Sequence, residues 1–575
     1  MRRFDRMSQV TGLINVARGL APADLVLSNA RIVNVFNGEI ERGNIAIHGG
    51  RIAGIGDYTL ARQTVDIKGQ YLLPGLIDGH THVESSLLDI PEYARTVIPH
   101  GTLGVVTDLH EIANVCGIKG IEYVLKAARR LPFEFFVMAP SCVPATHLET
   151  SGAVIDAESV RRLLKRKEVI GLGEMMNYPG ILFGDDGVLR KIAATGSKPV
   201  DGHAPGLGGY DLNAYIASGI SSDHECVALA EAREKLARGM YIMIREGSSE
   251  KNLEALLPLV TDKTYKRCLF VVDDRSCADL LRDGDIDAVA RKAIKLGLEP
   301  VRAIQLATIN AAERFGLKNI GAIAPGYLAN LVVMPDLKRF EAGMVFHRGR
   351  LVARDGEPLF KAAAINRSGV DGTVNVRPFG LDDIQIKTSS EEFPVIEIVP
   401  GQIITRKVEL KVGRDKDGFV VPDVSQDVLK IIVLERHKAS GNIGRGLVKG
   451  FGLKGGALAS SVAHDSHNIV AVGTNDKDIR AAVNRVISMQ GGLAIAADGK
   501  VLGELPLPVA GLMSDKPLTE VAETFARVEE AAQGLGCTLA APFATLSFMA
   551  LPVIPELRLT DMGLVDVGAF KIIQP

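Results

Sequence analysis

The stretch LLPGLIDGHTHV at residues 72–83 places an apolar run directly before two histidines. Seven later stretches likewise contain an apolar run of the kind that forms a β-strand. They are GTLGVVTDLHE (101–111), FEFFVMAPSC (133–142), EVIGLGEMM (168–176), KPVDGHA (198–204), GISSDHE (219–225), MYIMIREGS (240–248) and CLFVVDDRS (268–276). Segments between them, such as IKGIEYVLKAARR (118–130), space their apolar residues as amphipathic helices do. Eight strand and helix repeats over about 250 residues predict an α/β fold built on a (β/α)8 barrel of the TIM type.

Short strands with turn dipeptides lie on both sides of the barrel segment. Asn37-Gly38 and Gly49-Gly50 interrupt the β-branched runs of residues 24–58, and His347-Arg-Gly-Arg-Leu-Val resembles His48-Gly-Gly-Arg-Ile-Ala. We therefore predict a flanking composite β-sandwich from residues 1–73 and 321–368, with the catalytic barrel at 74–320 between them. Residues 369–575 have strands and helices of their own and are predicted to form an additional C-terminal α+β domain.

Composition limits the classes of function. The 575 residues carry 66 basic and 68 acidic side chains, so no overall field favours nucleic acid or anionic lipid, and neither partner is expected. The six dispersed cysteines contain no C-x-x-C pair, which argues against a disulfide framework and a cysteine-rich zinc site. Asp5 interrupts the N-terminal arginines and no run of eighteen apolar residues occurs, so we expect a cytoplasmic protein that does not enter membranes.

The carboxyl ends of the predicted strands carry the candidate chemistry, because the active site of a barrel lies at that end. These ends hold His80, His82, His110, Glu111, Glu174, His203, His224, Arg245, Glu246, Asp273 and Asp274. The period of two along a strand places His80 and His82 on one face, so both imidazoles can approach one ion. One H-x-H pair is weak evidence, but with acidic or imidazole endings on four further strands it predicts a metal centre.

This constellation, opened by PGLIDGHTHVESS (74–86), resembles the amidohydrolase superfamily. AHDSHNIVAVG (463–473) and LPLPVAGLMSD (505–515) extend the resemblance, to the adenine deaminase branch, over almost the whole chain. It implies His80, His82 and Asp273 as ligands of one divalent ion and His203 and His224 as ligands of a second. Glu174 would bridge the two, where dihydroorotases and hydantoinases use a carboxylated lysine.

The same resemblance implies an activity, namely hydrolytic deamination of adenine to hypoxanthine and ammonia in purine salvage. Two ions would lower the pKa of a shared water and provide hydroxide at neutral pH. Imidazole and carboxylate donors suit manganese, iron or zinc, and the resemblance favours manganese or iron. Superfamily members are commonly homodimers or homotetramers, so one of these states is expected.

The catalytic roles follow from the resemblance too. Asp273 would move the water's proton to the departing nitrogen, and Glu111, with His110 beside it, would protonate a purine ring nitrogen. Asp274 competes with Asp273 for the ligand position, since strand alternation sends only one of them inward. The favoured alternative for Asp274 is a helix cap or a salt bridge to Arg275.

Further residues are candidates for substrate binding. Arg245 and Glu246 either hydrogen-bond the purine edges or form a salt bridge, and Asn177 is a weaker candidate. His464 and His467 form an H-x-x-H pair without a third ligand, so we expect their loop to approach the barrel mouth and His467 to assist substrate closure.

Two other readings of the sequence compete with deamination. A cyclic-amide hydrolase of the dihydroorotase or hydantoinase type is disfavoured, because the bridging lysine is missing. A non-catalytic scaffold is disfavoured, because every ligand position is filled and an unused cluster of buried charged groups would cost stability.

Overall fold

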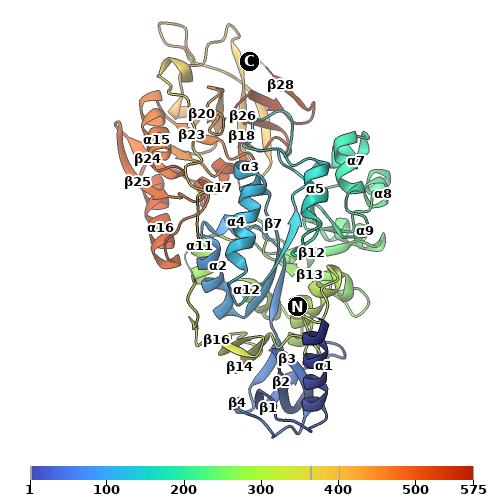
Figure 1. Ribbon diagram of the computed structural model, residues 1–575. Helices are drawn as coiled ribbons and strands as arrows, with labels where there is room; N and C mark the ends of the chain where they lie inside the picture. Colours follow the sequence, from blue (N-terminus) through green and yellow to red (C-terminus); the bar gives the residue numbers. More distant parts are fainter. Residues whose placement is uncertain (1–2, 363–364, 401, 574–575) are drawn as a thin grey trace.

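The computed structural model describes residues 3–362, 365–400 and 402–573, with a central barrel segment between a small β region and a larger C-terminal region (Figure 1). Parallel strands of the central segment pair in the orders β6-β7-β8-β9-β10 and β11-β12-β13. Backbone hydrogen bonds join the two groups, from Ser221 to Val200 at 3.4 Å and from Asp273 to His80 at 3.0 Å. The strands therefore form a curled parallel sheet of the TIM type. Their bounds are β6 Leu76–Thr81, β7 Thr102–Asp108, β8 Glu134–Ala139, β9 Val169–Met175, β10 Val200–Gly202, β11 Ser222–Asp223, β12 Tyr241–Arg245 and β13 Cys268–Val271.

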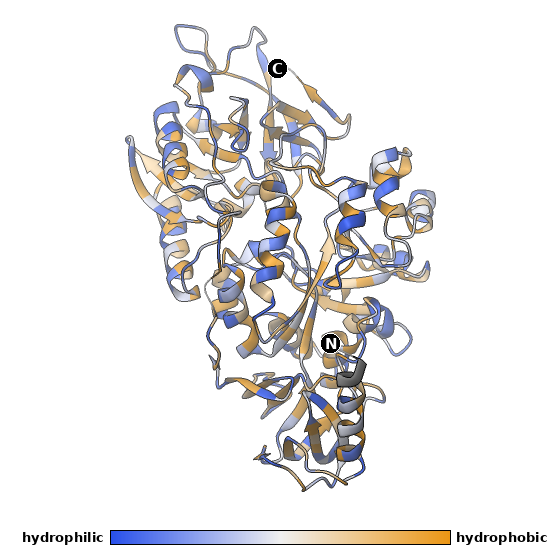
Figure 2. Cartoon of the chain, in the orientation of Figure 1, coloured by the Kyte–Doolittle hydropathy of each residue, from blue (hydrophilic) through white to orange (hydrophobic). Residues whose placement is uncertain are grey.

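Helices follow the strands and pack apolar faces against them. In α4, Ile121, Val124 and Leu125 are buried, whereas Glu122 and Lys126, four residues apart on the opposite face, are exposed. Figure 2 shows the same division, with apolar strands inside and polar helix faces outside. The helices are η1 Val83–Ser86, α2 Ile90–Val97, η2 Ile98–His100, α3 His110–Cys116, α4 Ile118–Ala128, α5 Ala157–Leu163, α6 Tyr178–Leu182, α7 Asp186–Ala193, α8 Gly209–Ala217, α9 Leu229–Ala237, α10 Leu253–Leu256, η3 Leu257–Leu259, η4 Tyr265–Arg267, α11 Cys277–Arg282, α12 Ile286–Lys295, α13 Pro300–Leu306 and α14 Ile309–Arg314.

The two flanks of the barrel meet in one sheet, as predicted. Strand β14 pairs antiparallel with β5, with Val332 opposite Leu73, so the chain returns to the sheet it left before the barrel. The strands are β1 Leu25–Val33, β2 Ile40–His48, β3 Arg51–Gly56, β4 Thr64–Asp66, β5 Tyr71–Pro74, β14 Leu331–Met334, β15 Met344–His347, β16 Arg350–Arg354 and β17 Glu357–Pro358. A helix, α1 Arg3–Ala17, precedes them in a part of the predicted β domain for which no element was predicted, and its Val16 packs with Ala23, Val26 and Ala46.

The C-terminal region is built on a mixed eight-stranded sheet and a three-stranded sheet. The strand and helix patterns predicted there are confirmed by β18, β19, β20, β23, α15 and α16. Its elements are η5 Asp382–Ile384, β18 Glu392–Ile398, β19 Thr405–Lys411, η6 Val424–Gln426, β20 Val428–Leu434, β21 Ile443–Lys449, β22 Ala457–Ser460, β23 Ile469–Gly473, α15 Asp476–Ser488, β24 Gly492–Ala497, β25 Lys500–Pro506, α16 Leu518–Gly534, α17 Pro542–Phe548, β26 Leu557–Thr560, β27 Gly563–Asp566 and β28 Lys571–Ile573.

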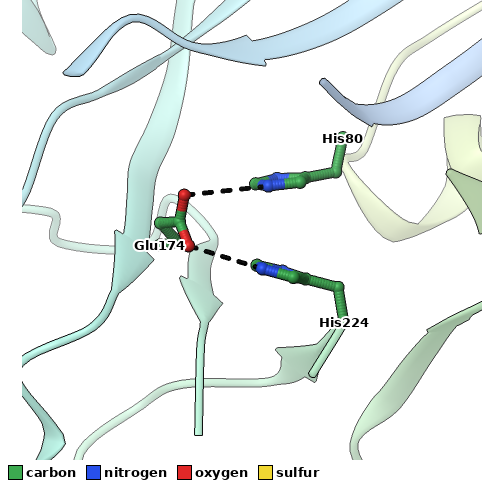
Figure 3. A group of neighbouring side chains, drawn as sticks. All are labelled: His80, Glu174 and His224. Atoms are coloured by element: carbon green, nitrogen blue, oxygen red, sulfur yellow. Dashed lines mark ion pairs between the residues drawn. The ribbon is translucent and has the colours of Figure 1, made fainter. Parts of the chain in front are cut away.

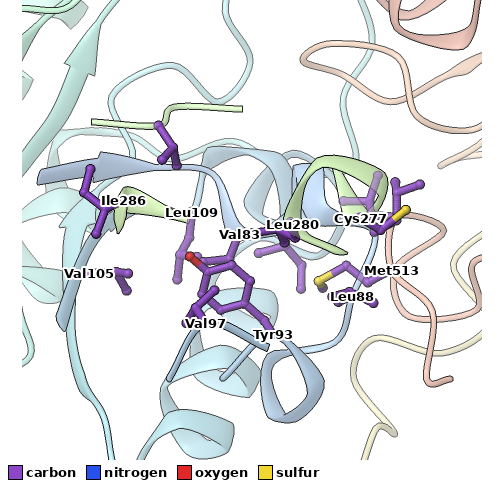
Figure 4. Close-up of a cluster of buried hydrophobic side chains, with 14 of the residues drawn as sticks. Val83, Leu88, Tyr93, Val97, Val105, Leu109, Cys277, Leu280, Ile286 and Met513 are labelled. Carbon is purple, nitrogen blue, oxygen red and sulfur yellow. The ribbon is translucent and has the colours of Figure 1, made fainter. Parts of the chain in front are cut away.

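The C-terminal region is tied to the carboxyl-end loops of the barrel strands. Met513 lies in the same buried cluster as Leu88 and Cys277 of the barrel (Figure 4). The backbone N–H of Asp89 donates to the carbonyl of Ser514 at 3.0 Å. This seam brings C-terminal residues to the barrel mouth. None of the helices in the described ranges has the length and apolar character needed to cross a bilayer.

Candidate metal centre and active site

Glu174, at the end of β9, lies at the centre of the imidazole cluster. Its Oε1 is 3.1 Å from His82 Nε2 and 3.8 Å from His80 Nε2. Its Oε2 is 2.7 Å from His203 Nδ1 and 3.4 Å from His224 Nε2. Figure 3 shows Glu174 with one oxygen towards His80 and the other towards His224. The two carboxylate oxygens thus face two different pairs of imidazoles. His80 and His82 lie at the end of β6, whereas His203 follows β10 and His224 follows β11.

Asp273 lies beside the first pair of imidazoles, those of His80 and His82. Its Oδ1 lies 3.1 Å from His82 Nε2 and 3.4 Å from His80 Nε2, and its Oδ2 accepts a hydrogen bond from Arg245 Nη1 at 2.7 Å. The backbone of Asp273 has a φ of 61°, in the left-handed region. Because the strand geometry ends there, the next residue does not have to point away from the site.

Asp274 accordingly lines the same cavity, and the prediction that alternation turns only one of the two carboxylates inward is wrong. Its Oδ1 accepts a hydrogen bond from Ser85 Oγ, a contact from η1. The favoured alternative is wrong as well, since Ser276 caps α11 and the nearest carboxylate to the Arg275 guanidinium is Asp283, at 3.9 Å.

The buried carboxylates of the cluster are stabilised by positive charge beside them. Burial by itself would raise the pKa of Glu174, but hydrogen bonds from His203, His224 and His82 hold it well below its usual range. Burial would lower the pKa of His82, but Asp273 and Glu174 raise it well above the ordinary value. Glu174 and His82 are therefore both charged because opposite charges lie beside them.

The donor set fits two divalent ions. His80 Nε2 is buried and has no hydrogen-bond partner among the described residues, although carboxylate oxygens lie 3.4 and 3.8 Å away. A ligating nitrogen aimed between carboxylates is what a metal site requires, and such groups of three donors occur on both sides of Glu174. The structure therefore brings together the six predicted ligands.

Glu225 is a member of this cluster that the sequence reasoning missed. Its Oε1 is 3.3 Å from His224 Nε2 and 3.6 Å from His203 Nδ1, and it accepts a hydrogen bond from Arg245 Nη1 at 2.5 Å. The signal was the Asp-His-Glu triplet at 223–225, in which only the histidine was assigned a role. Arg245 lines the cavity, but its salt bridges are with Glu225 and Asp273 and not with Glu246, the partner that the sequence suggested.

A second network surrounds Glu111 at the start of α3. Glu111 Oε1 is 2.7 Å from His464 Nδ1 and 3.3 Å from His110 Nε2, and Oε2 contacts His467 Nε2. Burial would raise the pKa of Glu111, but His464, His467 and His110 hold it well below its usual range. The predicted approach of the 463–468 loop to the barrel mouth is confirmed. The prediction that Glu111 donates a proton to the ring conflicts with this environment, because an ionised carboxylate has no proton to give.

The cavity has an apolar wall that the sequence reasoning did not identify. Ile403, Phe548, Leu551 and Ile554 of the C-terminal region line it opposite the strand ends, together with His464 and Asp465. These residues are more than 100 positions away from the strand-end motifs, so no local pattern connects them. The cavity is therefore formed jointly by the barrel and the C-terminal region.

Three predicted substrate-binding residues lie outside the described lining of this cavity. Glu246 points to the other side of β12, where it pairs with Lys292 Nζ at 2.5 Å. Asn177 caps α6 by accepting the N–H of Gly180 at 2.9 Å. His467 is buried, and both of its ring nitrogens are used within the protein, by Ala463 N at 3.1 Å and by Glu111. The structure therefore does not bring these three predicted side chains into the cavity lining.

Comparison with known proteins gives two family matches. Residues 71–361 match the amidohydrolase family, and residues 402–571 match the adenine deaminase C-terminal domain. An adenine deaminase of Dehalococcoides mccartyi (strain ATCC BAA-2266 / KCTC 15142 / 195) is 64% identical over 566 residues, which is 98% of this chain and 99% of the relative. Adenine deaminase 2 of Carboxydothermus hydrogenoformans is 48% identical over 568 residues, covering 99% of both chains. A solved L-hydantoinase from Arthrobacter aurescens aligns with 59% of this chain and 98% of its own, at 15% identity and a TM-score of 0.43.

Proposed function

The chain belongs to the adenine deaminase branch of the amidohydrolase family, and from this premise we propose that two divalent ions, held by the cluster around Glu174, serve its deamination of adenine. The enzyme hydrolyses the exocyclic amino group of adenine, a small purine substrate. His80, His82 and Asp273 would hold one ion, His203 and His224 the other, and Glu174 both. Manganese or iron is the proposed metal, with zinc as an alternative, on the basis of the donor set and the superfamily resemblance.

One observation carries this proposal. The two oxygens of Glu174 face separate pairs of imidazoles, at 3.1 and 3.8 Å on one side and 2.7 and 3.4 Å on the other. A carboxylate placed in this way can share its charge between two ions. When bound, the ions supply activation of the attacking water, since they lower its pKa from about 15.7 towards 7.

The protein's own residues orient the reaction. Arg245 holds Oδ2 of Asp273, so that carboxylate keeps a fixed position beside His82 while it accepts the proton of the attacking water and passes it to the departing nitrogen. The apolar wall of Ile403, Phe548, Leu551 and Ile554 offers a surface for the flat purine ring and excludes water from it.

The competing cyclic-amide hydrolase would need a lysine at the bridge. Among the described residues that line the cavity, none is a lysine. Lys191 of α7 is used elsewhere, because its Nζ donates to the carbonyl of Ser141 at 2.6 Å.

Further proposals concern the domain limits, the closure of the barrel, the location and the assembly of the protein. The domain limits 1–73 with 321–368, 74–320 and 369–575 follow the sheets, which change near these positions. The composite sheet supports the predicted β-sandwich, and the seams of the curled sheet support a closed (β/α)8 barrel. We also propose purine salvage and a homodimer or homotetramer, on the basis of the superfamily resemblance, and a cytoplasmic location.

The test is to load the purified protein with Mn²⁺ or Fe²⁺, add adenine, and follow ammonia release and purine absorbance while counting metal by mass spectrometry. We expect turnover with two ions per chain and no dependence on carbon dioxide. A single ion at full activity would reject the bimetallic proposal. Hydrolysis of dihydroorotate or a hydantoin that needs carbon dioxide would instead support a lysine-bridged site.

A further inference from the structure

Both carboxylate oxygens of Glu111 accept hydrogen bonds. The N–H of Ala463 donates to His467 Nδ1 at 3.1 Å, so the imidazole of His467 is neutral and carries its proton on Nε2. Burial agrees with this form, since together with the charges of His464 and Arg436 it outweighs Glu111 and lowers the pKa of His467 to about 4. Its Nε2 therefore donates to Glu111 Oε2, while His464 Nδ1 donates to Oε1 at 2.7 Å. A carboxylate in this position acts as an acceptor.

His464 is fixed on three sides and lines the cavity. Its Nδ1 is held by Glu111, its ring stacks on Phe548 with centroids 4.7 Å apart and an angle of 18° between the planes, and its backbone N–H donates to Ser547 Oγ at 3.2 Å. Within the described residues, the hydrogen bond of its ring is made by Nδ1 and none is made by Nε2. Nε2 is thus the polar atom that remains for a ligand.

The charges that face His464 favour its protonated form. Glu111 and Asp274 face it from the barrel, Asp465 follows it on its own loop, and the residues of α17 that contact it, Ser547 and Phe548, are uncharged. Burial alone would lower the pKa of His464, but Glu111, Asp274 and Asp465 raise it to about 10. The ring is therefore an imidazolium at neutral pH, next to a carboxylate that has no proton.

We propose that His464, from the C-terminal region, is the catalytic acid that protonates the purine ring, and that Glu111 is the positioning residue that holds its imidazolium. This inference rests on the proposed function. As the oxygen of water adds to the reacting carbon, the C=N π electrons move to the ring nitrogen, which takes the proton from His464 Nε2. Asp273 passes the first water proton to the amino group, which leaves as ammonia. The hydroxyl proton released when the C=O bond forms restores the imidazolium.

Two variants separate His464 from Glu111 as the acid. In His464→Asn the side-chain amide still reaches Glu111 as a donor but cannot transfer a proton, so we expect kcat to fall by about 10²- to 10⁴-fold, with KM nearly unchanged. In Glu111→Gln the imidazole keeps an acceptor but loses its counter-charge. Activity should then persist at low pH, and the alkaline limb of the kcat/KM profile should move to lower pH.

His437→Asn is the matched control, because His437 lies in the same region and binds the carbonyl of Ser466 at 2.7 Å without lining the cavity. It should keep kcat within about threefold. The proposal is overturned if His464→Asn keeps more than a tenth of kcat, if Glu111→Gln is inactive at every pH, or if His464→Asn loses its bound metal. The number of metal ions in the unaltered enzyme tests the bimetallic centre separately. The role of His464 is tested by the ratio of kcat between the variant and the parent enzyme, which does not depend on that number.

Discussion

Replacing Glu174 with glutamine should weaken the binding of both metal ions together. The amide keeps the shape of the side chain and one oxygen, so the change removes mainly the negative charge between the imidazoles of His82 and His203, which lie 3.1 and 2.7 Å from its two oxygens. Two unit charges about 4 Å apart attract by about 4 kcal/mol at an effective dielectric constant of 20. Since about 1.4 kcal/mol is tenfold in affinity, each ion should bind about 1,000-fold more weakly.

The assay is metal content by mass spectrometry after dialysis against a graded series of chelator concentrations. The parent enzyme should retain two ions under conditions in which Glu174→Gln retains neither. Glu250→Gln is the matched control, because Glu250 lines the same cavity and burial raises its pKa to about 7, so its charge is already partly lost at neutral pH. Loss of one ion alone from Glu174→Gln, or an equal loss from Glu250→Gln, would contradict the bridging assignment.

Three further outcomes are expected. Arg245→Met leaves two buried carboxylates without their guanidinium and should destabilise the metal-free protein by about 3–5 kcal/mol, with partial recovery on adding Mn²⁺, as measured by urea unfolding. Phe548→Leu removes the ring that stacks on His464, so KM for adenine should rise about two- to tenfold in steady-state assays while metal content stays constant. Burial raises the pKa of Glu149 to about 8. Between about pH 4.5 and pH 8 the folded chain therefore keeps a proton on Glu149 that the unfolded chain has released, so the stability of the folded state falls as the pH rises through this range. Glu149→Gln should therefore raise Tm at pH 8 much more than at pH 5, and an equal shift at both would contradict this.

Much of the metal centre could be predicted from the sequence because its information is local. Alternation within a strand placed His80 and His82 on one face, and a parallel barrel gathers the carboxyl ends of its strands at one mouth, so Glu174, His203 and His224 had to converge there. The order of the motifs along the chain was enough, and no distance had to be known.

Local patterns failed where the chain leaves regular geometry. The left-handed backbone of Asp273 cancels the alternation that was used to exclude Asp274 from the cavity. Asn177 and Glu246 follow strand ends in the sequence, but one caps a helix and the other pairs with Lys292 behind the strand. Proximity to a motif did not determine the direction of these side chains.

The sequence by itself determined the curled parallel sheet, the strand ends that form the metal cluster and the family resemblance, because periodicity and motif order are properties of short segments. Only the tertiary structure decided how Glu111 is used. Its partners His464 and His467 lie 353 and 356 residues further along the chain, and the seam between barrel and C-terminal region sets them against its carboxylate. Whether a carboxyl group gives or accepts a proton depends on the charges packed around it, and such packing is fixed only when distant segments meet.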